Sequence, residues 1–239
     1  MIRRDQLTSD LRHAWRMILR MPVLATVVIL SLAVGIGVNT VVFSWIQAVV
    51  LQPLPGVRDA STFQHVEPRA EGGVHPGVSW PEYRDLRARL TSFQDLLAFR
   101  MVPFFVGEAA RTERSYGLLV SGNYFAALGV QPALGRFMRP DEAAQPGGAP
   151  VVVISHDFWQ ARFDGSPTVI GQVLRVNDRE LTVIGVAPAR FQGTVMGLSF
   201  DLWAPATLAP VRLAGSRELE ARGDRGYQVM GQLRPQVTR

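Results

Sequence analysis

The feature that most constrains this chain is an unbroken apolar run near its amino terminus. Residues 23–51 read VLATVVILSLAVGIGVNTVVFSWIQAVVL and contain no charged side chain. At about 1.5 Å per residue, a helix of this length reaches roughly 40 Å, whereas the hydrocarbon core of a bilayer is about 30 Å thick. The run therefore predicts a transmembrane helix that continues into the start of a stalk. A charge-free run of this length is not typical of a core helix in a soluble protein.

A cleaved signal peptide is the main alternative for this run. The apolar segment is about twice as long as a usual signal-peptide core, and no clear small-x-small cleavage site follows it. We therefore expect an uncleaved anchor in the cell (inner) membrane. Five Arg residues precede the span, and the next Arg is Arg58. The positive-inside rule then predicts that residues 1–22 are cytoplasmic and that the chain after about residue 52 is extracytoplasmic, in the periplasm.

The cytoplasmic segment, residues 1–22, has an amphipathic pattern. Apolar residues recur at helical spacing, and Arg12, Arg16 and Arg20 fall on another face. This pattern predicts a helix in the cytoplasmic headgroup layer, with Trp15 at the interface and the Arg side chains facing lipid phosphates. A frayed basic tail is the alternative.

Small and polar residues follow a regular spacing inside the apolar run. Ser31, Gly35 and Asn39 lie four residues apart, Gln47 continues the period, and Gly37 lies four residues after an Ala. Small residues let helix backbones approach closely, and an Asn in hydrocarbon requires a hydrogen-bond partner on another helix. The span is therefore expected to pack against other transmembrane helices or a homodimer partner, within the lipid bilayer.

The composition excludes several kinds of chemistry. All 25 basic residues are Arg and there is no Cys, so the printed residues can form neither a P-loop, which needs a Lys, nor a Schiff base or a thiolate site. Any ATP used would be bound on another chain. Beyond residue 51 there are 20 Arg and 18 acidic residues, without the Arg and aromatic clusters of a nucleic-acid groove. We therefore expect no nucleic-acid partner.

The first part of the extracytoplasmic region reads as strand, helix, strand. TFQHVEP (62–68) predicts a strand, and the SWPE sequence at 79–82 has the spacing of a capping box, which predicts a helix over 80–90. A second strand is expected over 97–107.

The middle part is denser in short strands and turns. We expect strands at SYGLLVS (115–121) and PVVVIS (150–155), short helices at NYFAALG (123–129) and HDFWQARF (156–163), and a hairpin that turns near Asn177 and Asp178. The aromatic residues of both helices are expected to pack against the sheet.

No constellation of residues for catalysis emerges. Ser155, His156 and Asp157 are sequence neighbours whose side chains diverge, so a helix N-cap at Ser155 or Asp157 explains them better than a triad. The four His residues are far apart and show no metal-ligand spacing. The carboxylate pairs Asp141 with Glu142 and Glu218 with Glu220 lie in polar segments, where we expect solvated charge. We thus expect no catalytic, cofactor-binding or metal-binding residue, and no enzyme.

Several motifs together resemble one known family. These are LRHAWRMILRMP, LSLAVGIGVNTVVFS and LQPLPG near the start, then VSWPEYRDLR, LVSGNYFAALGVQPALGRFM, the stretch at 150–188 and DLWAP. In this order they resemble permeases with a MacB-like periplasmic core domain and an FtsX-like membrane module, of the stand-alone type without a fused ATPase. The resemblance covers nearly the whole chain but only the amino-terminal portion of such a permease.

The resemblance implies a fold and a domain organisation. It implies an α+β protein with one transmembrane helix and a mixed α/β extracytoplasmic domain over 52–239. Within this domain, a porter-like βαβ half (57–107 and 221–239) would hold an inserted, strand-rich subdomain (about 108–220). The chain would be incomplete at its carboxyl end, where the strand at 227–233 would be left as an exposed edge prone to association.

The resemblance also implies a function. The chain would be a permease-derived component of an ABC system, coupling ATP hydrolysis on a separate ABC ATPase subunit to movement of the extracytoplasmic domain, for efflux, export or signalling. An envelope or outer-membrane partner would receive that movement. The alternative is a membrane-tethered binding or scaffold module without transport activity, including a truncated permease fragment. The resemblance leaves the cargo open.

Overall fold

The computed structural model describes residues 21–46, 54–57, 59–70, 73–74, 77–107, 112–212 and 216–234. The chain divides into two units, residues 1–52 and residues 53–239, and each is described by itself.

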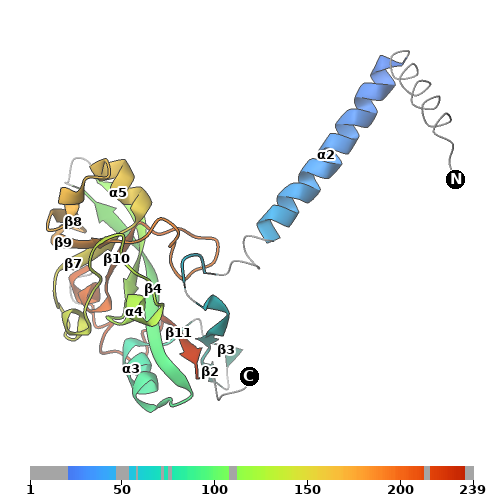
Figure 1. Cartoon of the computed structure of the whole chain (residues 1–239). Helices are drawn as coiled ribbons and strands as arrows, with labels where there is room; N and C mark the ends of the chain where they lie inside the picture. Colours follow the sequence, from blue (N-terminus) through green and yellow to red (C-terminus); the bar gives the residue numbers. More distant parts are fainter. Residues whose placement is uncertain are drawn as a thin grey trace. The chain divides into compact units, whose positions relative to one another are not determined.

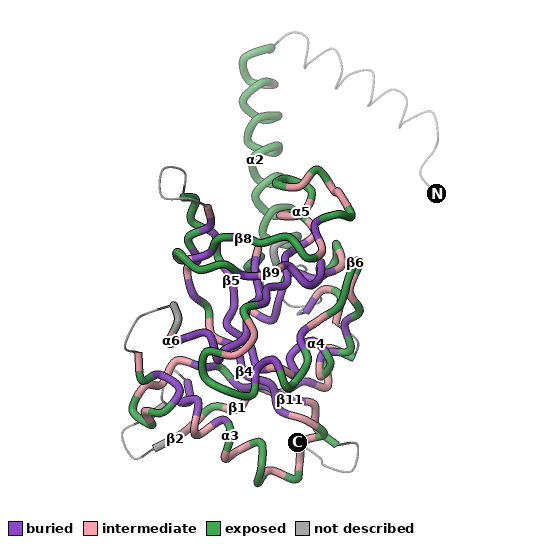
Figure 2. The backbone as a smooth tube through the Cα atoms, turned by 90° about the vertical axis from the view of Figure 1, so that its left-hand side faces the viewer, coloured by how far each residue is buried: buried purple, intermediate pink, exposed green. Residues whose placement is uncertain are grey.

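The first unit is represented by helix α2, Pro22–Ile46 (Figure 1). Its 25 residues include no charged side chain. Pro22 occupies the first helical position, where its missing N–H costs no hydrogen bond. Nearly all of α2 is exposed (Figure 2). The helix expected in this part of the apolar run is thus present, and its place in a membrane stays a prediction.

The second unit is built on a mixed nine-stranded sheet. Its main path is β1 (Phe63–Val66), β11 (Gln228–Leu233), β4 (Phe93–Val106), β5 (Glu113–Val120), β10 (Leu202–Pro205), β7 (Val151–Ile154), β9 (Arg179–Val186) and β6 (Leu134–Gly135), while β8 (Val173–Val176) pairs with β4 and β9. Two pairs are parallel, β10 with β5 and β7 with β9. A separate hairpin joins β2 (Arg69–Ala70) to β3 (Gly73–Val74).

Short helices connect these strands. They are α3 (Trp80–Arg89), α4 (Tyr124–Ala127), α5 (His156–Phe163) and α6 (Ala209–Arg212), with 3-10 turns η2 (Ala60–Thr62), η3 (Pro140–Ala143), η4 (Pro167–Val169) and η5 (Ala206–Leu208). The mixed α/β domain that follows an apolar helix confirms the predicted fold class.

The helix starts confirm two local predictions. At α3 the Ser79 hydroxyl accepts a hydrogen bond from the Glu82 N–H, and the Glu82 carboxylate accepts one from the Ser79 N–H, which completes the capping box. At α5 the Ser155 hydroxyl accepts a hydrogen bond from the Phe158 N–H. Ser155 is thus an N-cap, as its place before the helix predicted.

The hairpin between β8 and β9 turns at the two residues that the sequence indicated. Asn177 has φ 48° and Asp178 has φ 59°. Two successive residues with positive φ form the type of turn that matches the twist of a β-hairpin, and Asn and Asp tolerate this conformation better than most residues. The Asn177 side chain also accepts a hydrogen bond from the Phe105 N–H at 2.8 Å, which ties the turn to β4.

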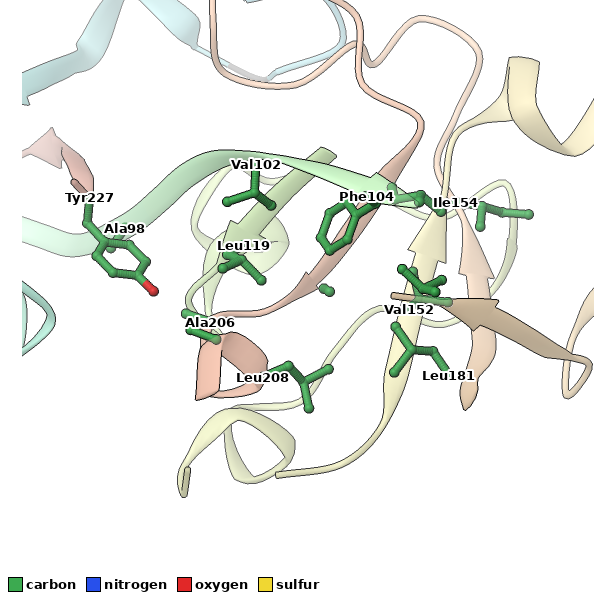
Figure 3. Close-up of a cluster of buried hydrophobic side chains, with 14 of the residues drawn as sticks. Ala98, Val102, Phe104, Leu119, Val152, Ile154, Leu181, Ala206, Leu208 and Tyr227 are labelled. Atoms are coloured by element: carbon green, nitrogen blue, oxygen red, sulfur yellow. The ribbon is translucent and has the colours of Figure 1, made fainter. Parts of the chain in front are cut away.

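Two buried clusters lie on opposite faces of β4, because side chains alternate along a strand. Leu96 and Ala98 belong to the first cluster, part of which is drawn in Figure 3, and Leu97 and Phe99 belong to the second. The predicted aromatic packing is confirmed in both. Tyr124 and Phe125 of α4 are buried in the second cluster, and the aromatic side chains of α5 pack, partly buried, against the first: Phe158, Trp159 and Phe163.

The strand at 227–233 is not an exposed edge, and that prediction was wrong. β11 pairs antiparallel with β1 on one side and with β4 on the other. β1 and β4 are therefore parallel to each other, and the connection between them through α3 leaves a gap one strand wide, which β11 fills. Within the described residues β1, rather than β11, ends this side of the sheet.

The predicted porter-like and inserted parts share this sheet. β4 and β11 of the first part continue directly into β5, β10 and β7 of the second. The division of the domain at about 108 and 220 stays a prediction. β4 itself begins at Phe93, four residues before the predicted start.

Candidate functional site: an apolar helix and a pocketed α/β domain

Helix α2 carries four of the five residues predicted to pack in the membrane. Ser31, Gly35 and Asn39 advance by four residues and share one face of α2, whereas Gly37 lies on the opposite side. Space for a side chain is open around both glycines. Gln47, Arg12, Arg16, Arg20 and Trp15 lie outside the described residues.

The polar groups of α2 differ in how they are satisfied. The hydroxyls of Thr26 and Thr40 each donate to the carbonyl four residues earlier, at 2.8 Å. Among the described residues, no hydrogen bond joins the Asn39 side-chain amide to another group. In hydrocarbon such an amide favours a partner on a second helix. Within α2 the stretch Pro22–Ser44, with a mean hydropathy of 2.2, is long and apolar enough to cross a bilayer.

In the second unit, the segment before β11 is held by a partly buried ion pair. Arg100 of β4 contacts Glu218, with Nη1 2.9 Å from Oε1, and only 3% of the Glu218 side chain is exposed. Tyr227 donates its hydroxyl hydrogen to the same carboxylate at 2.7 Å. The prediction that Glu218 is solvated was wrong, because Arg100, far away in sequence, lies against it. Glu220 is exposed, as predicted.

Two further ion pairs join this segment to α3. Arg225 contacts Glu82 at 2.6 Å, and Arg222 contacts Asp85 at 2.7 Å. Although partial burial acts in the opposite direction, hydrogen bonds from Ser79 and the ion pair with Arg225 lower the pKa of Glu82. Residues 218–225 are therefore joined by ion pairs both to β4 of the sheet and to α3.

Asn123, just before α4, is the centre of a buried polar network. Its amide donates to Asp95 Oδ2 at 2.6 Å and to the Leu96 carbonyl at 2.8 Å. The Tyr83 hydroxyl lies 3.2 Å from Asn123 Oδ1. The Asp95 carboxylate in turn accepts hydrogen bonds from Arg87 Nε, at 3.0 Å, and from Arg87 Nη2, at 3.4 Å. This network joins α3, β4 and the start of α4.

A surface pocket of about 430 Å³ opens beside this network. α3 forms one wall, and the 121–123 turn and η3 form the others. The lining residues are Trp80, Tyr83, Arg84, Arg87, Ala88, Ser121, Gly122, Asn123, Pro140, Ala143 and Ala144. The turn and η3 pack tightly at the back of the pocket, since a Cβ on Gly122 would lie 3.0 Å from Pro140 Cα.

The loop that carries η3 contains a second carboxylate for which the prediction of solvation was wrong. Glu142 is 8% exposed and is held by Arg136, with Nη2 2.6 Å from Oε1. Hydrogen bonds from Arg136 lower the pKa of Glu142 to about 2, and the Arg139 N–H and the nearby Arg charges act in the same direction against partial burial. Asp141 is exposed, as predicted.

The residues considered for catalysis are accounted for by structure. His156 Nδ1 lies 3.9 Å from its neighbour Asp157, while Ser155 caps α5. Within the described part of the chain, no group of three His, Asp or Glu residues could hold a metal ion. The sequence pattern missed the Arg100–Glu218 pair, the Asn123 network and the pocket. Arg100, a charged residue inside the apolar stretch 96–106, was a local signal for the first of these.

Comparison with solved structures gives the class of this fold. The periplasmic region of MacB from Actinobacillus actinomycetemcomitans superposes with a TM-score of 0.56 at 16% identity, covering 77% of this chain and 78% of that one. A domain of a putative permease from Porphyromonas gingivalis gives a TM-score of 0.55 at 20% identity, covering 76% and 79%. The second unit thus shares the fold of the periplasmic region of MacB.

The family follows from the sequence. The family model for the MacB-like periplasmic core domain matches residues 25–239 of the sequence, so the chain belongs to this family. A macrolide export ATP-binding/permease protein, MacB, from Burkholderia thailandensis is 28% identical over 160 residues, which are 62% of this chain and 24% of that protein. The chain thus spans about a quarter of the length of such relatives. The resemblance seen in the motifs is confirmed at the level of the family.

Proposed function

We propose that this chain is a permease component of a MacB-like ABC transport system, in which ATP hydrolysis on a separate subunit moves the extracytoplasmic domain. The observation that carries the proposal is the joining of a MacB-like periplasmic core domain to an apolar helix long enough to cross a bilayer. The printed residues contain no Lys and therefore form no P-loop, and the proposal assigns nucleotide binding to a separate ATPase subunit. The coupled movement would drive efflux, export or signalling.

The proposal assigns distinct roles to parts of the chain. The face of α2 with Ser31, Gly35 and Asn39 packs against other transmembrane helices, and Gly37 allows close approach on the opposite side. The Arg side chains at 12, 16 and 20 and Trp15 face the cytoplasmic headgroups, close to the ATPase. The domain after residue 52 lies outside the membrane and contacts an envelope or outer-membrane partner.

The test of coupling uses the full chain in nanodiscs with co-expressed MacB-type ATPase subunits. Copurification and a change in ATP turnover when the chain is present would support the proposal. Asn39→Leu should weaken recovery of the complex roughly fivefold, since one interhelical hydrogen bond contributes about 1 kcal/mol. Thr40→Leu is the matched control, because the Thr40 hydroxyl is already bonded to the Ile36 carbonyl. If no complex forms and ATP turnover is unchanged, the tethered binding or scaffold module becomes the better reading.

The absence of Cys from the sequence allows a clean test of topology. A single Thr91→Cys variant should react with a membrane-impermeant maleimide in intact spheroplasts, and a Ser9→Cys variant should react only after lysis. The reverse pattern would contradict the proposed orientation.

A further inference from the structure

The lining of the pocket beside the Asn123 network is positively charged. Its lining includes two guanidinium groups, Arg84 and Arg87, and no carboxylate. Arg87 is already neutralised by Asp95. Among the described residues Arg84 forms no ion pair and its side chain is exposed. The adjacent Asp85 is itself paired with Arg222, so the Arg84 guanidinium at the mouth of the pocket is open to a ligand.

The remaining walls supply two other kinds of surface. Trp80, Ala88, Pro140, Ala143 and Ala144 present apolar carbon. The polar residues Tyr83 and Asn123 also line the pocket, and both are almost fully buried. Both are fixed by hydrogen bonds to the backbone carbonyl of Leu96. A rigid lining of this kind is pre-organised, so that binding a ligand need not order it first.

These features together define a class of ligand. A volume of about 430 Å³ lies in the range of small-molecule sites, which combine apolar walls with a few fixed polar groups. A guanidinium at the rim favours carboxylate, sulfonate or phosphate oxygens. We propose that this pocket binds a small amphipathic anion, a flat apolar body that carries one acidic group. The apolar body lies between Trp80 and Ala144, and the acidic group lies at Arg84. This site does not depend on coupling to an ATPase.

The probe for this site is naphthalene-2-sulfonate, and its uncharged counterpart is naphthalene-2-sulfonamide. Calorimetry with the full chain in phosphatidylcholine nanodiscs, corrected by empty nanodiscs, should show saturable binding of the sulfonate. Arg84→Gln should weaken sulfonate binding roughly fivefold, the upper range for an exposed ion pair, and leave sulfonamide binding within about twofold. Arg89→Gln, on the same helix but outside the lining, should change neither.

A second variant tests the location of the site. Ala144 is exposed on the pocket wall, so Ala144→Trp should fill the pocket without disturbing the core and should abolish binding of both probes at an unchanged unfolding midpoint. Unchanged binding in this variant would overturn the proposal, as would equal losses in Arg84→Gln and Arg89→Gln, or no saturation by either probe at millimolar concentration.

A further calorimetry experiment distinguishes a lipid headgroup from a soluble anion as the natural ligand. Replacing part of the lipid by phosphatidylglycerol should weaken sulfonate binding to the unmodified chain if a lipid headgroup competes for the pocket. Unchanged binding argues against this lipid headgroup and favours a soluble anion. The anion site itself is supported by saturable sulfonate binding and by its weakening in Arg84→Gln.

Discussion

Arg100 and Glu218 form an ion pair in which Nη1 and Oε1 lie 2.9 Å apart, although only 3% of the Glu218 side chain is exposed. Arg100 belongs to β4, whereas Glu218 precedes β11, the strand that pairs with β4. The Glu218 carboxylate also accepts the Tyr227 hydroxyl hydrogen. This pair therefore joins the returning segment of the chain to the middle of the sheet.

Replacing Glu218 should destabilise the second unit. Glu218→Gln leaves the Arg100 guanidinium with only the Asp224 carboxylate, 3.5 Å away. We expect a loss of about 1–3 kcal/mol, below the full value for a buried pair because Arg100 is partly exposed. Chemical unfolding of the full chain in detergent, followed by tryptophan fluorescence, measures the change. Glu220→Gln removes the same charge from an exposed position and should stay within about 0.5 kcal/mol. Equal effects would contradict a special role for Glu218.

Glu142 should make stability depend on pH in the acidic range. Its pKa in the folded protein is lowered from 4.5 to about 2 by hydrogen bonds from Arg136. The stabilisation is therefore fully present above pH 4.5 and is lost as the pH falls toward about 2, since the unfolded chain takes up the proton first. Between pH 4.5 and about 2, the free energy of unfolding should change less steeply with pH in Glu142→Gln than in the unmodified chain. Asp141→Asn, beside it but exposed, should keep the slope of the unmodified chain.

Ser79→Ala should weaken the start of α3. The substitution removes the hydroxyl that accepts from the Glu82 N–H, and the loss of such a cap costs about 1 kcal/mol. The same unfolding assay measures it. Thr91→Ala, just beyond the other end of the helix, is the control and should have little effect. A loss no greater than that of the control would show that the capping box contributes nothing measurable.

The β8–β9 turn should respond in opposite ways at its two positions. Asn177→Ala places a residue that disfavours positive φ at φ 48° and removes the hydrogen bond from the Phe105 N–H, so we expect a loss of about 1–2 kcal/mol. Asp178→Gly suits φ 59° and should be neutral or stabilising. Thermal unfolding of both variants distinguishes them, and destabilisation of similar size at both positions would argue against this turn geometry.

The predictions from sequence that the structure confirms depend on short stretches of chain. The capping box at Ser79 and Glu82, the N-cap at Ser155 and the turn at Asn177 and Asp178 each involve residues within three positions of one another. Their conformations follow from local hydrogen bonding and from the backbone preferences of the residues concerned. The same holds for the apolar run that becomes α2, because a helix satisfies its own backbone.

The predictions that were wrong concern residues whose surroundings come from elsewhere in the chain. Glu142 and Glu218 appeared solvated because their sequence neighbours are polar, yet Arg136 and Arg100 bury and pair them. β11 was predicted to be an exposed edge, yet it pairs with β1 on one side and with β4 on the other.

The sequence alone determined the apolar helix, the helix caps, the hairpin turn and the family. Only the tertiary structure decided which carboxylates are buried, where β11 lies in the sheet and that α3, the 121–123 turn and η3 enclose a pocket. The physical reason is distance along the chain. Contacts such as Arg225 with Glu82, 143 positions apart, depend on how the sheet brings segments together, and no local pattern of residues records that arrangement.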